Sequence, residues 1–305
     1  MSNENKNSNN LLGSYYGTKF SGAIFCFLMV FYVFITFIGQ LVLSACGVNF
    51  ESTLYIAISG CFSIIAIILV LIMARFGKKQ TFSSLLSIKK CGVIWYIIAV
   101  LLFIGMFFGL GFINVHFTDF LNKIFNITPL EIGKNFTLTK YVVLSITLAI
   151  LPAVFEELFF RGILLNSLIS GGKLFAVILS SICFSIYHCS ISQLIYQFVF
   201  GLAFSLIAIN SKSILPCIVA HFLNNFIILT AYYFKIESSI FSTLTIVIGF
   251  IALAIFILFI VYICVRNKVF KTKSGGEKNA LNNFIVPFGV GGVAVCLMLI
   301  VLGLL

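Results

Sequence analysis

Charged residues are scarce in this chain. Only 9% of its 305 residues are charged, and just eight of them are acidic. Soluble globular domains carry about 25% charged residues, whereas 61% of this chain is hydrophobic and its mean hydropathy is +1.19. A soluble globular protein is therefore excluded. The composition predicts an all-α, polytopic helical membrane protein with about 8–9 transmembrane helices.

The apolar residues form long uninterrupted runs. Runs of about 18 or more apolar residues are typical of membrane-spanning helices. The predicted spans lie near residues 21–46, 53–74, 92–115, 141–168, 174–190, 193–210, 214–234, 239–265 and 284–305. Apolar residues also recur at helical spacing within 117–125, which predicts a short helix in the membrane interface.

The positive charges gather in alternate loops, and the net charge is +11. Residues 75–91 and 266–283 are rich in Lys and Arg, and two smaller loops add Lys173 and Lys212. With nine spans and the N-terminus inside, all four loops face the cytoplasm, as the positive-inside rule requires. We therefore expect a multi-pass protein of the cell membrane with a cytoplasmic N-terminus and an outer C-terminus. The same distribution argues against binding of nucleic acid.

Several familiar motifs are absent. None of the nine cysteines forms a CxxC pair or a Cys/His ligand spacing, so no zinc site is predicted from them. HExxH, the helix motif of many zinc proteases, is missing as well. No repeat of fixed period and no soluble domain are found. The predicted organisation is a cytoplasmic tail (1–20), N-terminal helices with loops (21–140), a polar core (141–234), and C-terminal helices with a basic linker (235–305, linker 266–283).

Two acidic residues stand side by side inside an apolar run. Glu156 and Glu157 lie in LAILPAVFEELFFRGILL, where the only other charge is Arg161. A carboxylate at mid-membrane costs about 3 kcal/mol on insertion scales and usually marks a pathway, a relay or a catalytic site. Glu157 and Arg161 share a helix face at i and i+4 and can pair, whereas Glu156 is turned about 100° away. Glu156 is therefore the strongest candidate for function.

Two further spans of the same block carry polar residues one helical turn apart. Phe184 and His188 stand on one, and His221 and Asn225 on the other. Counted from the cytoplasmic ends at about 1.5 Å per residue, Glu156, His188, His221 and Asn225 can meet near the midplane. Such a set fits water activation, with the carboxylate as general base and a His–Asn pair as donors to an oxyanion. A structural reading stays open for each residue: interhelical hydrogen bonding for the histidines, a brace for Glu157–Arg161, and packing for Phe184.

At these residues the chain resembles a known family, the CAAX-protease and bacteriocin-processing (CPBP) intramembrane proteases, also called Abi or type II CAAX prenyl endopeptidase-like proteins. The family's signature is EExxxR, then FxxxH, then HxxxN or HxxxD on successive spans. Here the three motifs begin at Glu156, Phe184 and His221. The resemblance covers about residues 141–234, roughly a third of the chain.

The resemblance implies an intramembrane endopeptidase. Glu156 and His188 would activate water, His221 and Asn225 would stabilise the oxyanion, and Glu157, Arg161 and Phe184 would support the site. The resemblance leaves the cofactor as none or unknown: the family, once described as metal-dependent, is now described as glutamate-based, which fits the lack of a zinc motif here. If a metal is bound, Glu156, His188 and His221 would be its ligands.

The expected partners are the lipid bilayer and a peptide or protein substrate at the membrane, lipidated or unlipidated. The expected role is bacterial peptide processing or self-immunity to a bacteriocin. Two alternatives stay open: a non-catalytic immunity or scaffold protein that kept the motifs, and a proton-coupled transporter with Glu156 as relay. A transporter more often shows repeated halves with broken helices in both, and the polarity here is confined to one block.

Overall fold

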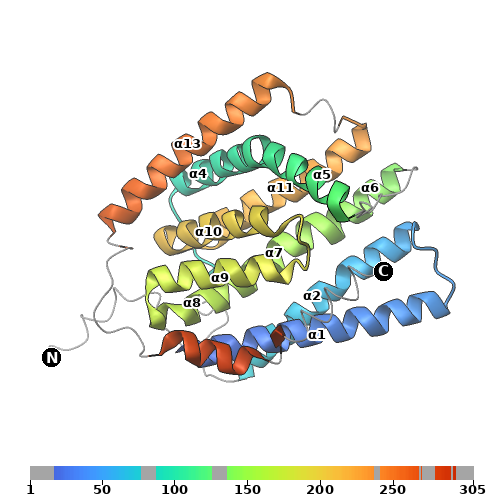
Figure 1. The fold of residues 1–305 in the computed structure, drawn as a ribbon, viewed down its shortest axis with the longest axis horizontal. Helices are drawn as coiled ribbons and strands as arrows, with labels where there is room; N and C mark the ends of the chain where they lie inside the picture. Colours follow the sequence, from blue (N-terminus) through green and yellow to red (C-terminus); the bar gives the residue numbers. More distant parts are fainter. Residues whose placement is uncertain are drawn as a thin grey trace.

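A computed structural model describes residues 17–76, 87–125, 136–236, 241–267, 269, 279–289 and 291–292. All regular structure in these ranges is helical, and the helices pack side by side as an elongated bundle (Figure 1). The prediction of a polytopic helical membrane protein is confirmed. The elements, in chain order, are α1 (Gly17–Ala45), α2 (Thr53–Phe76), α4 (Val93–Ile104), η1 (Gly105–Leu110), α5 (Gly111–Phe125), α6 (Leu138–Leu144), η2 (Ser145–Ile150), α7 (Leu151–Glu157), η3 (Leu158–Leu164), α8 (Leu165–Leu168), η4 (Ile169–Gly171), α9 (Lys173–Tyr187), α10 (Leu194–Ser211), α11 (Leu215–Phe234) and α13 (Thr243–Arg266).

Seven helices in the described ranges are long and apolar enough to cross a membrane, and each corresponds to one of the nine predicted spans. The fifth predicted span is instead the shorter helix α9, whose 15 residues rise about 22 Å against a hydrocarbon core of about 30 Å. The ninth predicted span, 284–305, falls largely outside the described residues, as do most of the predicted tail and basic linker.

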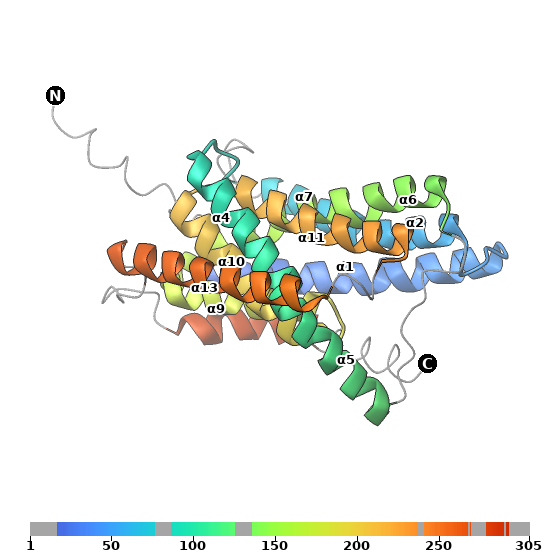
Figure 2. The ribbon, with the colours of Figure 1, turned by 90° about the horizontal axis from the view of Figure 1, so that it is seen from above.

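The short interfacial helix predicted at 117–125 is not a separate element. Helix α5 continues without a break from α4 and η1, so that Val93–Ile124 is one long apolar helix. Figure 2 shows α5 leaving the bundle at an angle. Periodicity predicted the helical conformation correctly, but it carries no information on whether the preceding span has ended.

Glycines allow this long helix to cross α13 closely. A Cβ atom on Gly249 would lie 2.5 Å from the backbone nitrogen of Gly109, and one on Gly105 would lie 2.8 Å from the backbone of Leu253. Small residues at such crossings let two backbones approach in a membrane, where no hydrophobic force drives helices together.

The helices alternate in direction, and one end of the bundle, on the left in Figure 1, collects most of the basic residues. We call this the basic end; its described charges are Lys19, Arg75, Lys89, Lys90, Lys173, Lys212 and Arg266, whereas the opposite end holds Lys123, Lys140 and Lys235 together with Glu51 and Asp119. From Lys173, α9 runs away from the basic end, turns at residues 188–193, and returns as α10. This hairpin stops well short of the far ends of α1 and α2 (Figure 1).

Candidate functional site

The acidic pair stands where the helix Leu138–Gly171 changes its winding. Glu156 and Glu157 end α7, and the π-helical segment η3 follows and carries Arg161. π-Helical turns are rare and occur often at functional sites. Glu156 is 6% exposed, Glu157 0% and Arg161 1%, so three charged side chains lie in the interior of the bundle.

One oxygen of the Glu157 carboxylate accepts two hydrogen bonds. Its Oε1 accepts a hydrogen bond from Nη1 of Arg161 at 2.9 Å and another from Nδ1 of His221 at 2.9 Å. The first contact is the pair expected from the i, i+4 spacing. The second was not expected: it joins α7 to α11 and fixes the orientation of the His221 ring, as carboxylates commonly do for functional histidines.

Aromatic rings enclose the Arg161 guanidinium. Its Cζ lies 4.2 Å from the ring centroid of Phe184, 5.0 Å from that of Phe204 and 5.9 Å from that of Phe160. Cation–π attraction of this kind contributes up to about 2 kcal/mol when desolvated. Phe184, expected to support the site, packs on the arginine, and Phe204 of α10 joins it although no sequence motif singled it out.

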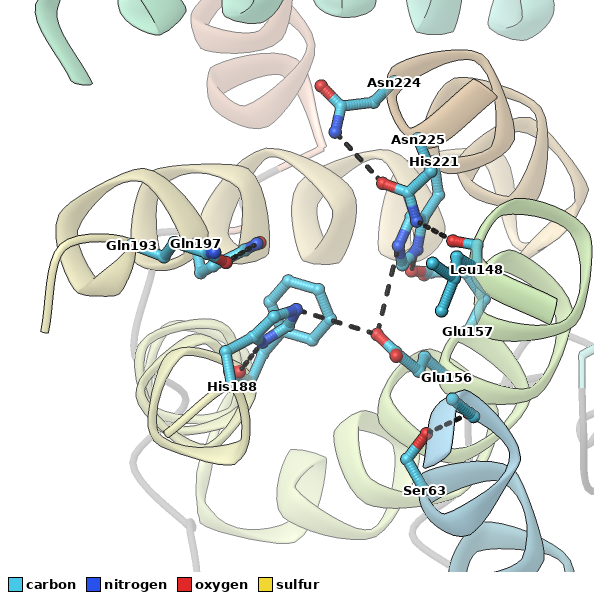
Figure 3. Close-up of polar contacts among 12 residues, drawn as sticks. Ser63, Leu148, Glu156, Glu157, His188, Gln193, Gln197, His221, Asn224 and Asn225 are labelled. Carbon is cyan, nitrogen blue, oxygen red and sulfur yellow. Dashed lines mark hydrogen bonds and ion pairs between the residues drawn. The ribbon is translucent and has the colours of Figure 1, made fainter. Parts of the chain in front are cut away.

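Glu156 faces two histidines from two other helices. Its Oε2 lies 3.9 Å from Nε2 of His188 and 3.9 Å from Nε2 of His221 (Figure 3). Oε2 is buried and makes no hydrogen bond with any residue in the described part of the chain. The structure thus brings together Glu156, His188 and His221, three of the four residues predicted to be catalytic.

Both imidazoles have their other nitrogen occupied. Nδ1 of His188 lies 2.8 Å from the backbone carbonyl of Phe184, and Nδ1 of His221 bonds the Glu157 carboxylate. A carbonyl and a carboxylate only accept, so each Nδ1 carries the proton and donates it. In the neutral rings, both Nε2 atoms therefore present a lone pair toward Glu156. An acceptor oxygen that lies 3.9 Å from each of two acceptor nitrogens suits a donor placed between them, such as water.

Asn225, the fourth predicted catalytic residue, is placed differently. Its Nδ2 donates to the backbone carbonyl of Leu148 at 3.2 Å, and its Oδ1 accepts from Nδ2 of Asn224 at 3.2 Å (Figure 3). Among the described residues, no hydrogen bond joins Asn225 to Glu156 or to either histidine. Its amide instead ties α11 to the helix that carries the acidic pair.

Pro152 removes one possible donor to the Leu148 carbonyl. Leu148 lies in the π-helical segment η2, and in a regular α-helix the N–H of residue 152 would donate to the carbonyl of residue 148, but proline has no N–H. The side chain of Asn225 donates to this carbonyl instead. The adjacent Asn224 is buried and accepts from the hydroxyl of Tyr196 at 2.8 Å. Pro152, four residues before Glu156, is the feature of the sequence that lies nearest to this contact.

The residues named as ligands in the event of a bound metal do converge. Even so, within the described ranges no group of three or more His, Cys, Asp or Glu side chains is placed to hold a metal ion.

The comparisons with known proteins agree with this part of the chain. Residues 138–227 match the family model described as type II CAAX prenyl endopeptidase Rce1-like. No curated protein and no solved structure matches the chain. The match supports a CAAX-type intramembrane protease, a hydrolase at the family level. Because it spans all three motifs, the resemblance to the CPBP intramembrane proteases is confirmed over residues 138–227.

Proposed function

We propose that this protein hydrolyses a peptide bond within the membrane, using a water molecule activated by Glu156 and His188. The observation that carries the proposal is the arrangement at Glu156 Oε2, which is buried, makes no hydrogen bond with the described residues, and faces two imidazole Nε2 atoms at 3.9 Å. A buried acceptor without a donor is costly. Such a group is expected where a ligand or a reacting water supplies the donor.

In the proposed reaction, Glu156 takes a proton from water while the hydroxide oxygen attacks the carbonyl carbon of the substrate. The tetrahedral intermediate collapses when the C–N bond breaks, and the proton passes from Glu156 to the leaving nitrogen. His188 accepts the second hydrogen of the water through Nε2, because its Nδ1 is bound to Phe184. This contact orients the nucleophile before attack.

His221 needs a second proton to stabilise an oxyanion. As a neutral ring with Nδ1–H bound to Glu157, it offers a lone pair at Nε2. As an imidazolium it would donate from Nε2, and the Glu157 carboxylate would stabilise its charge, as the aspartate does in a Ser–His–Asp triad. We assign to Glu157 this supporting role in addition to its pairing with Arg161.

Asn225 is retained in the proposal as an oxyanion donor or as a residue that positions α7. Its contact with Leu148 favours positioning. The proposed biological role is processing of a secreted peptide or self-immunity to a bacteriocin, by resemblance to the CPBP proteins.

The decisive experiment compares wild-type protein with Glu156→Gln on lipidated and unlipidated peptides in detergent or proteoliposomes. Gln has nearly the same shape and no charge, so the variant should unfold at the same temperature as wild type or higher. It cannot accept a proton from water, so turnover should fall by about 10²–10⁴. His188→Ala should lose activity to a similar extent.

Glu51→Gln is the matched control, because it removes a carboxylate in the loop between α1 and α2, outside the cluster. It should keep wild-type turnover. A folded Glu156→Gln protein that cleaves at the wild-type rate would contradict the proposal and favour the scaffold or transporter alternative.

A further inference from the structure

The two sides of the Glu156 cluster differ in structure. One side faces the basic end and the other faces the opposite end of the bundle. The helix Leu138–Gly171 runs toward the basic end, so Arg161 lies on that side of Glu156. Phe184 precedes His188 on α9 and lies on the same side, as does Phe204 on α10. What fills each side therefore decides how a substrate can enter.

The side facing the basic end is filled. Arg161 is 1% exposed, and the rings of Phe160, Phe184 and Phe204 that surround it are fully buried. The His221 ring also lies against Phe204, at 5.9 Å between centroids. Further toward the basic end, Leu164, Ile207 and Cys217 are fully buried as well. Side chains packed at this density leave no route for a peptide.

The opposite side carries an exposed polar turn. The hairpin α9–α10 ends at residues 188–193, and His188 is the most exposed of the three clustered side chains, at 18%. Beside it, Ser190 and Ser192 bond each other at 3.1 Å, and Gln193 is exposed. Figure 3 shows Gln193 and Gln197 in the same close-up as His188.

This turn lies at membrane depth. From Lys173, the 15 residues of α9 rise about 22 Å of a hydrocarbon core of about 30 Å. The hairpin is tightly closed, because a Cβ on Gly201 would lie 2.9 Å from Cα of Ser181, and Ser185 donates to the carbonyl of Leu194. Irregular backbone and polar side chains are tolerated at such depth only where protein buries them or water reaches them. Because Gln193 is exposed and therefore not buried by protein, we infer that water reaches this turn.

We propose that the Glu156 cluster is open only toward the end opposite the basic loops, and that its substrate is a peptide segment arriving from the non-cytoplasmic half of the bilayer. The assignment of sides follows from the basic residues, which stay in the cytoplasm. Residues 189–197 include no charged side chain, and Ile191, Leu194 and Ile195 are exposed there. The entrance thus suits an uncharged, partly apolar segment. The substrate part of this proposal rests on the proposed function; the direction of access does not.

Native cysteines provide the test. Cys189 follows His188 and is half-buried, Cys46 is exposed at the end opposite the basic loops, and Cys91 is half-buried at the basic end. The background protein has Cys46, Cys61, Cys91, Cys189 and Cys296 replaced by Ala. In this background Cys189, Cys46 or Cys91 is restored, one in each variant. Gln193→Cys in the same background gives a second, more exposed reporter of the turn.

Each variant is treated with a membrane-impermeant sulfonated maleimide, in right-side-out and in inverted vesicles. Cys189 and Gln193→Cys should react from the side on which Cys46 reacts, and labelling from the Cys91 side should be at least tenfold slower. Faster labelling from the Cys91 side, labelling from both sides, or no labelling of Gln193→Cys from either side would overturn the proposal. The parent background should stay unlabelled.

Cleavage is then measured separately. In proteoliposomes sorted by orientation, a quenched uncharged peptide added outside should be cut only where the Cys46 side faces out, and Glu156→Gln should abolish the signal. Labelling from the Cys46 side without cleavage in either orientation would contradict the proposed function and the substrate, while the direction of access would stand. Cleavage from the Cys91 side would overturn the proposal of access.

Discussion

Asn225 donates a side-chain hydrogen bond of 3.2 Å to the carbonyl of Leu148, a carbonyl to which residue 152, a proline without an N–H, cannot donate. The bond ties α11 to the helix of the acidic pair, eight residues ahead of Glu156. It also gives Asn225 a structural task that competes with the oxyanion role implied by the family motif.

The two roles of Asn225 predict different behaviour in a Pro152→Ala background. Alanine restores an N–H that can donate to Leu148, so a clamp becomes less necessary. If Asn225 positions α7, Asn225→Ala should cost about 1–3 kcal/mol of unfolding free energy in wild type and clearly less with Pro152→Ala, and activity should recover in parallel. If Asn225 donates to the oxyanion, activity should fall by about 10²–10³ in both backgrounds. Thermal unfolding and turnover of the four proteins decide between them.

Glu157 and Arg161 should show strong coupling. Removal of one partner leaves the other charge buried without its counter-charge, which costs about 3–5 kcal/mol. The double variant Glu157→Ala/Arg161→Ala leaves neither charge, so its loss of stability should be smaller than the sum of the single losses. A cycle measured by thermal unfolding in detergent tests this, and strictly additive losses would contradict an energetic pairing.

The pairing of Glu157 with Arg161 was predictable because it depends only on helical spacing within one segment. The same spacing correctly predicted that Glu156 does not share the helix face of Arg161. Convergence of Glu156, His188 and His221 also followed, since each stands at a comparable depth on its own helix. Helical spacing and depth along a single helix can both be read from one sequence, because they depend only on positions within one segment.

The other contacts of the site and the end of helix α9 could not be predicted, because they depend on features that hydrophobic periodicity does not encode. The π-helical segments η2 and η3 shift the register by a residue. The contact of His221 with Glu157 joins residues 64 positions apart, and Asn225 was free to face either the cluster or Leu148. Helix α9 ends at Tyr187, three residues before the predicted end of its span at residue 190, and periodicity does not predict that the chain turns back there.

Reporter insertions test the orientation predicted from the basic loops. An alkaline phosphatase or fluorescent reporter at Gly275 should behave as cytoplasmic, and one fused after Leu305 as external, because nine spans place them on opposite sides. Cys46 and Cys91, at opposite ends of the bundle, give an independent reading by labelling. The same location for both reporters would exclude the nine-span topology while leaving the site geometry untouched.

Treatment with metal chelators tests whether Glu156 acts on water directly. In the proposed mechanism, Glu156 accepts the proton and His188 orients the water, so the reaction requires no Lewis acid. Turnover should therefore stay within about twofold of the untreated value after incubation with EDTA or 1,10-phenanthroline, since general-base catalysis by a positioned carboxylate depends on geometry and protonation alone. Loss of activity that added zinc restores would contradict this, and would assign Glu156, His188 and His221 as ligands of a metal that activates the water instead.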